Sequence, residues 1–279
     1  MRQVQRQHWR PSFDCGLGDV KWARQFAPLR SAGMNGLRLA VSWLTVLPVR
    51  GPETVDRVAA GRAIALAPLV GGLLGAGAAG LLWMLVWVGA SPVLAGLLAV
   101  GALALITRGM HLDGLADTMD GLGSYGPPER ARQIMKSGGA GPFGVTALVF
   151  SIGVQAVSFA ALAEADRWFA VALAVTVGRI AVVLACRKGI DAAPDTSFGA
   201  LVAGTQHPLT AALWFAAALT AAIFATPDHW QGPLAILIAL TAATILVRHT
   251  VRRFAGLSGD TLGATIELTV SLTAATLSL

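Results

Sequence analysis

The sequence predicts an all-α protein built as a polytopic bundle of transmembrane helices. Hydrophobic residues make up 55% of its 279 positions and charged residues only 13%, whereas soluble domains carry about 25% charged residues. The mean hydropathy is +0.65, and short charged clusters separate long uncharged runs. This alternation is typical of a chain whose main solvent is a lipid bilayer.

The long apolar runs define the expected membrane-spanning helices. They cover residues 63–88, 93–107, 143–163, 168–186, 209–226, 233–250 and 261–279. A helix needs about 20 residues to cross the hydrocarbon core, so we expect about six to seven spans. A shorter apolar run from residue 37 to Pro48 is too short to cross, and it predicts an N-terminal interfacial or re-entrant segment.

Residues 1–33 differ from the rest of the chain because they are polar and basic and lack a helical apolar period. They also lack the charged start and apolar core of a signal peptide. We expect a disordered tail or an extension outside the folded unit, with a lipid-surface or partner-binding segment as the alternative. Residues 34–279 are expected to form a single integral-membrane domain.

The distribution of Lys and Arg predicts which membrane face carries the polar chemistry. Loops 49–62, 108–136, 187–207 and 248–260 contain 12 of these cations, whereas the opposite loops contain only Arg167. Basic loops face the cytoplasm, so we expect a protein of the cell membrane whose catalytic face is cytoplasmic. This pattern explains the net charge of +6 without a nucleic-acid partner, since no basic stripe with interleaved aromatics is present.

An acidic motif in residues 108–123 predicts a metal site. Asp113, Asp117 and Asp120 are spaced so that a helix places them on one face, where like charges repel. A cation turns that repulsion into coordination, and oxygen ligands favour Mg²⁺, with Mn²⁺ as an alternative, over zinc. A solvated acidic face or a helix N-terminus is the other interpretation. We favour the metal because the segment continues a spanning helix at the membrane surface.

A basic and glycine-rich segment follows the acids. Arg130, Arg132 and Lys136 precede the glycine-rich residues 137–144. Cations beside a metal suit the charge of a transferring phosphate, and glycines let backbone N–H groups approach phosphate oxygens. Positive-inside anchoring with a flexible loop remains the alternative for the two arginines.

Four further polar residues lie close to or inside the apolar runs. Arg179 is costly within a span unless it pairs or faces a polar cavity, and Asp260 and Glu267 lie two helical turns apart on the last span. We expect these three residues to bind substrate, with a structural ion pair among them as the alternative. His111 is a candidate general base or substrate contact, or a polar interfacial histidine.

The segment His111-Leu-Asp-Gly-Leu-Ala-Asp-Thr-Met-Asp-Gly121 closely resembles the signature of the cobalamin synthase family, the adenosylcobinamide-GDP ribazoletransferases. Other stretches resemble the family in the same order: Leu44-Thr-Val-Leu-Pro-Val49, Pro68-Leu-Val-Gly-Gly72, Ile134-Met-Lys-Ser137, Gly141-Pro-Phe-Gly-Val145, Gly178-Arg179, and Gly259-Asp-Thr-Leu-Gly-Ala264 with Glu267. Two departures stand out, because the family commonly has Ala at Met119 and often an Asp-Ser pair at Ser137-Gly-Gly.

The resemblance implies a metal-dependent transfer that completes the lower loop of cobalamin. A ribose hydroxyl of α-ribazole, or of its 5′-phosphate, attacks the cobinamide-side phosphorus of adenosylcobinamide-GDP, and GMP leaves. Mg²⁺ on the three aspartates neutralises charge on the leaving group, while Lys136 and Arg179 bind phosphate oxygens. Asp120 is our choice of general base, with His111 as the alternative. The oligomeric state and the preferred form of ribazole stay open.

Two other classes compete with this interpretation. A CDP-alcohol phosphotransferase also carries spaced aspartates in a membrane bundle, but here Asp117 follows Asp113-Gly-Leu-Ala where that class has an Ala-Arg pair. A cation or solute transporter would line a midplane route with acids, whereas these acids lie near one face.

Overall fold

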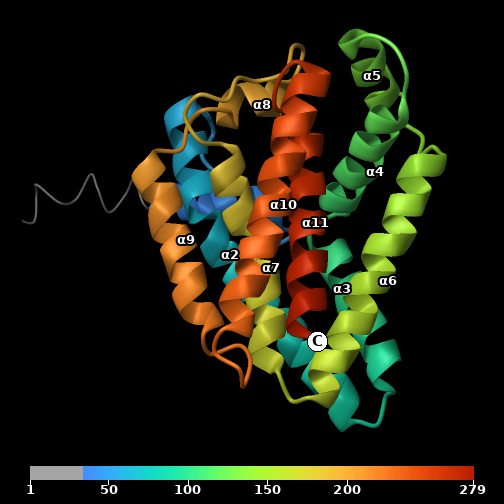
Figure 1. Cartoon of the computed structure of the whole chain (residues 1–279). Coiled ribbons are helices and arrows are strands. Elements are labelled where there is room, and N and C mark those ends of the chain that lie inside the picture. Colours follow the sequence, from blue (N-terminus) through green and yellow to red (C-terminus); the bar gives the residue numbers. More distant parts are fainter. Residues whose placement is uncertain (1–33) are drawn as a thin grey trace, which may run out of the picture.

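The computed structural model describes residues 34–279 and shows an all-α bundle (Figure 1). A helix over residues 34–44 comes first. The later helices are α2 (Arg57–Trp87), α3 (Pro92–Ile106), α4 (Met110–Gly123), α5 (Pro128–Met135), α6 (Pro142–Glu164), α7 (Trp168–Ala185), α8 (Ser197–Val202), α9 (Pro208–Ala222), α10 (Gln231–Phe254) and α11 (Gly259–Leu277). The all-α class is confirmed. The expectations for residues 1–33 lie outside the described residues.

Local sequence sets where several helices begin. The Asp56 side chain accepts a hydrogen bond from Ala59 N at the start of α2, and the Ser258 hydroxyl accepts one from Thr261 N at the start of α11. Such caps satisfy N–H groups that have no partner inside the helix. Helices α3, α5, α6 and α9 begin at proline, whose fixed φ suits the first helical position.

Four helices of the described chain are long and apolar enough to cross a membrane, namely α2, α6, α7 and α10, and α3 with α4 makes a fifth if that bent pair counts as one span. The seven apolar runs all form helices, but α3 and α9 have only 15 residues each, or about 22 Å. Helix α11 carries Asp260 and Glu267 and is largely buried. Helix length and composition therefore support four to five spans, and the six to seven expected from the sequence stay a prediction.

The acidic segment does not continue the preceding helix in a straight line. Helices α3 and α4 meet at an angle of 91°, because Arg108 and Gly109 both take left-handed backbone conformations, with φ of 58° and 67°. The Arg108 guanidinium donates hydrogen bonds to the carbonyls of Ser42 and Trp43, at 3.0 and 3.1 Å. The bend thus rests on the helix over residues 34–44, and it turns α4 toward α11.

Helix α11 lies in the middle of the bundle, in contact with α4, α6, α7 and α10 (Figure 1). The α2–α7 pair makes the most extensive helix–helix contact among the described residues. Glycine makes this second contact close, because a methyl group at Gly75 would lie 2.5 Å from the Ala172 carbonyl oxygen. The small-residue pattern of α2 therefore serves helix packing, as in other membrane bundles.

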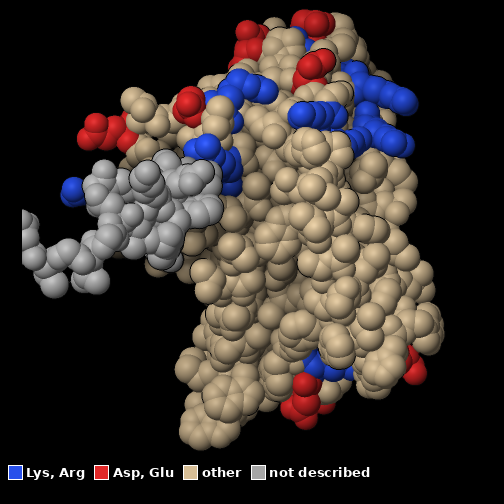
Figure 2. Space-filling model, turned by 90° about the vertical axis from the view of Figure 1, so that its left-hand side faces the viewer, with Lys and Arg blue, Asp and Glu red and all other residues tan. Residues whose placement is uncertain are grey.

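The charged loops gather at two ends of the molecule, with an uncharged belt between them (Figure 2). Contacts confirm that the four basic loops share one end. Arg57 donates to the Ala203 carbonyl at 2.7 Å, Lys136 to that of Asp195 at 3.1 Å, and Arg132 to that of Phe254 at 3.1 Å. We call this the basic end, defined by loops 49–62, 108–136, 187–207 and 248–260.

The α2–α7 contact gives a test of packing. We expect Gly75→Val to lower the melting temperature of the purified protein, because overpacking against backbone costs about 1–3 kcal/mol. Gly80→Val is the matched control, since nothing lies within 4 Å of a methyl group added there. Thermal unfolding in detergent measures both variants. Equal melting temperatures would contradict the packing role of Gly75.

Candidate functional site

Acidic side chains from two helices line one cavity at the basic end. Asp113 and Asp117 of α4 and Asp260 of α11 border a space of ≈ 370 Å³, together with Lys136 and residues 138–140. The helices meet closely here, because a methyl group at Gly114 would lie 2.7 Å from the Asp260 carbonyl oxygen. The structure thus brings the sequence motif together with an acid nearly 150 positions later. We call this space the acidic cavity.

Helix ends shape the electrostatics of the acidic cavity. Asp113 lies in the first turn of α4 and Asp260 in the first turn of α11. The partial positive charge of a helix N-terminus stabilises a carboxylate there and also favours bound phosphate. Lys136 borders the same cavity. The site therefore combines acids that attract a cation with positive groups that attract phosphate.

Asp120 has a different position from its two companions. Its carboxylate accepts hydrogen bonds from Gly141 N at 2.6 Å and Gly144 N at 2.9 Å, at the start of α6. The seven residues from Asp113 to Asp120 span about 10 Å along the helix, which takes Asp120 to this neighbouring helix. The structure does not place Asp120 on the wall of the acidic cavity. Its metal-binding and catalytic roles stay predictions.

The residues of the acidic cavity fit a magnesium ion by their chemistry. In the described part of the chain, no three His, Cys, Asp or Glu side chains form a group that could hold a metal by themselves. Mg²⁺ does not need such a group, because proteins usually hold it through one or two carboxylates together with water and substrate phosphates. Asp113 and Asp117, one helical turn apart on the same wall, match that requirement.

The predicted residues His111, Arg179 and Glu267 meet deeper in the bundle. They line one small space of ≈ 20 Å³, and His111 Nδ1 lies 3.5 Å from Arg179 Nη2. Glu267 instead accepts hydrogen bonds from Gln155 Nε2 at 2.7 Å and Ser151 Oγ at 3.4 Å. Among the described residues the ion pair found is Arg132–Glu129, so the structure does not support an ion pair of Arg179 with Glu267 or Asp260.

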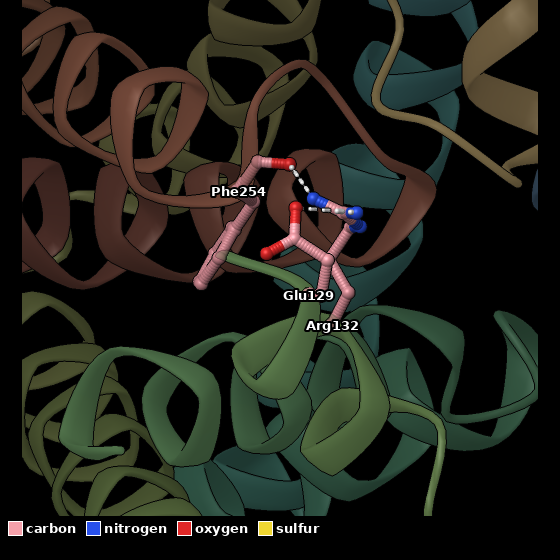
Figure 3. A network of polar contacts seen from close by, with 3 residues as sticks. All are labelled: Glu129, Arg132 and Phe254. Carbon is pink, nitrogen blue, oxygen red and sulfur yellow. Dashed lines mark hydrogen bonds and ion pairs between the residues drawn. The ribbon is translucent and has the colours of Figure 1, made fainter. Parts of the chain in front are cut away.

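Arg132 and Lys136 lie side by side but have different partners. Arg132 donates to the Phe254 carbonyl at 3.1 Å and contacts Glu129 at 3.5 Å (Figure 3). These bonds tie α5 to the end of α10. Lys136 borders both the acidic cavity and a second space of ≈ 250 Å³ that Arg132 also lines. Lys136 is therefore the cation best placed for a phosphate, and substrate binding by Arg132 stays a prediction.

Several residues around the site were not predicted from the sequence. Gln155 and Ser151 hold Glu267, and a lone amide within the predicted span 143–163 was the available signal for Gln155. Phe198 and Asp195 line the second space. Their loop was expected on the same membrane face as the acids, but nothing in its sequence marked these two side chains.

Comparison with known proteins assigns the chain to a family. The family model described as cobalamin-5-phosphate synthase matches residues 36–278. The chain belongs to this family. A relative from a Nocardioides species is 42% identical over 236 residues, which cover 85% of this chain and 95% of the relative. One from Corynebacterium efficiens is 39% identical over 246 residues, covering 86% and 90%. Both bear the name adenosylcobinamide-GDP ribazoletransferase. No solved structure matches the chain.

The family match includes every residue of the acidic cavity, from Asp113 to Asp260. The resemblance seen in the sequence is thereby confirmed at the level of the family. The tertiary structure adds that the acidic motif on α4 and the motif around Asp260 on α11 form two walls of one cavity.

The contacts of Asp120 predict a measurable effect on stability. We expect Asp120→Ala to destabilise the protein by about 1–3 kcal/mol, because two backbone N–H groups lose a charged acceptor. Asp117→Ala is the matched control, and its melting temperature should equal or exceed that of the parent protein because repulsion in the acidic cavity falls. Thermal unfolding without substrate or metal measures both. An unchanged melting temperature for Asp120→Ala would show that the carboxylate does not anchor α6.

Proposed function

We propose that this protein is an adenosylcobinamide-GDP ribazoletransferase that completes cobalamin, or cobalamin 5′-phosphate, with release of GMP. The observation that carries the proposal is the acidic cavity, where Asp113, Asp117, Asp260 and Lys136 converge in a chain matched by the family over residues 36–278. A diphosphate needs nearby positive charge, and a hydroxyl nucleophile needs a proton acceptor. Both kinds of group border this one space.

The bonds made and broken follow from the two substrates. A ribose hydroxyl of α-ribazole, or of its 5′-phosphate, forms a bond to the cobinamide-side phosphorus of the diphosphate. The bond from that phosphorus to the GMP oxygen breaks, and GMP leaves with the electron pair. The hydroxyl proton passes to a carboxylate. Mg²⁺, when bound, neutralises charge that develops on the diphosphate.

Each charged residue of the cavity has a role in this proposal. Asp113 and Asp117 hold the metal, and the Lys136 ammonium binds phosphate oxygens. Asp120, the base expected from the sequence, is already held by the start of α6. We therefore propose Asp260 as the acceptor of the hydroxyl proton, because it borders the acidic cavity and also the ≈ 240 Å³ space beside His111.

The membrane arrangement is part of the proposal. We infer six to seven crossings, with the 15-residue α3 and α9 and the 19-residue α11 completing the bundle and the basic end in the cytoplasm. The ratio of 12 cations to one between the two sets of loops supports this orientation, as does the uncharged belt between the two ends (Figure 2). Nucleotide-activated substrates would then reach the acidic cavity directly from the cytoplasm.

The catalytic assignment predicts the effect of removing one charge. We expect Asp117→Asn to lower the rate of GMP release by about 10²–10³-fold while the protein still folds and inserts. The assay supplies adenosylcobinamide-GDP and α-ribazole phosphate across a Mg²⁺ titration, with a chelator as the zero point. Asp166→Asn is the matched control, because Asp166 lies in the exposed α6–α7 connection at the other end.

Full activity of Asp117→Asn at limiting Mg²⁺ would overturn the metal assignment. Absence of GMP release from the unmodified protein at every Mg²⁺ concentration would overturn the proposed function itself.

The orientation predicts one-sided labelling. Tyr125 is 92% exposed at the basic end, and Cys186 is fully buried. In a Cys15→Ser background we expect Tyr125→Cys to react with a membrane-impermeant thiol reagent only from the cytoplasmic side. Asp166→Cys should react only from the other side. The reverse pattern would invert the topology.

A further inference from the structure

A mostly apolar cavity lies directly behind the acidic cavity. It measures ≈ 240 Å³, and side chains of α2, α7, α8 and α11 form its apolar walls, including Ala67, Val182, Phe198 and Ile266. Asp113 and Asp260 line this space as well as the acidic cavity. We call it the inner cavity. A ligand in it can therefore extend past these two carboxylates into the proposed site of transfer.

Two buried hydrogen-bond donors border the inner cavity. His111 and Arg179 line it, and they are only 5% and 3% exposed. Arginine has only donors, so His111 Nδ1 must be the acceptor in their 3.5 Å contact, which leaves the hydrogen of a neutral imidazole on Nε2. Neither His111 Nε2 nor Arg179 Nε has a hydrogen-bond partner among the described residues.

Unpartnered buried donors indicate a missing acceptor, since buried polar groups in native proteins are almost always hydrogen-bonded. The apolar walls limit what that acceptor can belong to, because a fully charged group loses its hydration there at high cost. Lys136, the cation best placed for phosphate, does not line the inner cavity. A matching ligand is an uncharged, mainly apolar group that carries a hydrogen-bond acceptor.

We propose that the inner cavity binds the benzimidazole base of ribazole, with His111 and Arg179 as donors to the ring nitrogen that carries no ribose. This inference rests on the proposed function and adds the subsite that selects the base. A cavity of about 150 Å³ takes up benzene, so ≈ 240 Å³ accommodates a two-ring base. With the base there, the ribose lies beside Asp113 and Asp260, and the diphosphate occupies the acidic cavity.

A substitution that fills the inner cavity tests whether the base of ribazole binds there. We expect Ala67→Leu to raise the KM for α-ribazole by about 10-fold or more, as for an overpacked contact, and to leave the KM for adenosylcobinamide-GDP unchanged. Ala102→Leu is the matched control, because Ala102 lines a different space of ≈ 250 Å³ between α2 and α3. An unchanged KM for α-ribazole in a folded Ala67→Leu variant overturns the proposal.

A substrate series on the unaltered protein tests the donors without any mutation. Replacing the free ring nitrogen of ribazole by a C–H group should weaken binding by about 10–100-fold, because the buried donors lose their acceptor. Free 5,6-dimethylbenzimidazole should compete with α-ribazole and not with adenosylcobinamide-GDP. Equal KM values for the two ribosides overturn the proposal, since a water in the ≈ 20 Å³ space would then satisfy both donors.

Inorganic phosphate serves as the competing probe. If phosphate competes with α-ribazole and Ala67→Leu weakens that inhibition, the inner cavity binds an anion and the base assignment is wrong. GMP release by the unaltered protein separates these outcomes from a failure of the proposed function, because the reaction must proceed before any KM for ribazole can be measured.

Discussion

The close contact between α4 and α11 is the constraint on which the rest of the site depends. A methyl group at Gly114 would lie 2.7 Å from the carbonyl oxygen of Asp260, and one at Gly263 would lie 3.0 Å from that of His111. Only two facing glycines allow the helix backbones to come this close. The contact sets Asp260 opposite Asp113 and Asp117, and it closes the inner end of the site around His111.

Three cavities meet at Asp260, and each has a distinct character. The acidic cavity combines carboxylates with Lys136. The second space brings Lys136 together with Arg132 and the α8 region, and the inner cavity is mainly apolar. A transfer between a nucleotide-activated substrate and a ribazole needs this division, because a diphosphate and a flat uncharged base require opposite surroundings. Asp260 borders all three spaces.

Helix α11 shows how a polar element is kept inside a membrane bundle. It contacts four other helices, and its Thr261, Thr265 and Thr269 are fully buried. Thr265 and Thr269 donate hydrogen bonds to backbone carbonyls one turn earlier. Glu267 is held by Gln155 and Ser151. Because these polar groups find partners within the protein and only the buried Thr273 hydroxyl of α11 lacks one among the described residues, α11 can carry functional side chains at a depth where lipid would exclude them.

The sequence by itself determined the all-α class, the positions of the apolar helices, the sharing of one end by the basic loops, and the family. These follow from hydropathy, from charge, and from a motif of eleven residues, all of which act locally along the chain. Residues of the acidic motif were also identified, although Asp120 contacts the start of α6 while Asp113 and Asp117 line the acidic cavity. Helical spacing fixes a face of α4, but it does not say which neighbour each side chain meets.

Only the tertiary structure decided those neighbours. The bend at Arg108 and Gly109 turns α4 away from α3, so Asp120 meets the start of α6 while Asp260 joins the other two acids. The tertiary structure also shows that Glu267 forms no ion pair with Arg179 and instead accepts a hydrogen bond from Gln155. Such contacts depend on the packing of helices far apart in sequence, which is set by the whole bundle. The acidic motif is therefore a single segment of the sequence, whereas the acidic cavity forms only when folding brings Asp260 and Lys136 to Asp113 and Asp117.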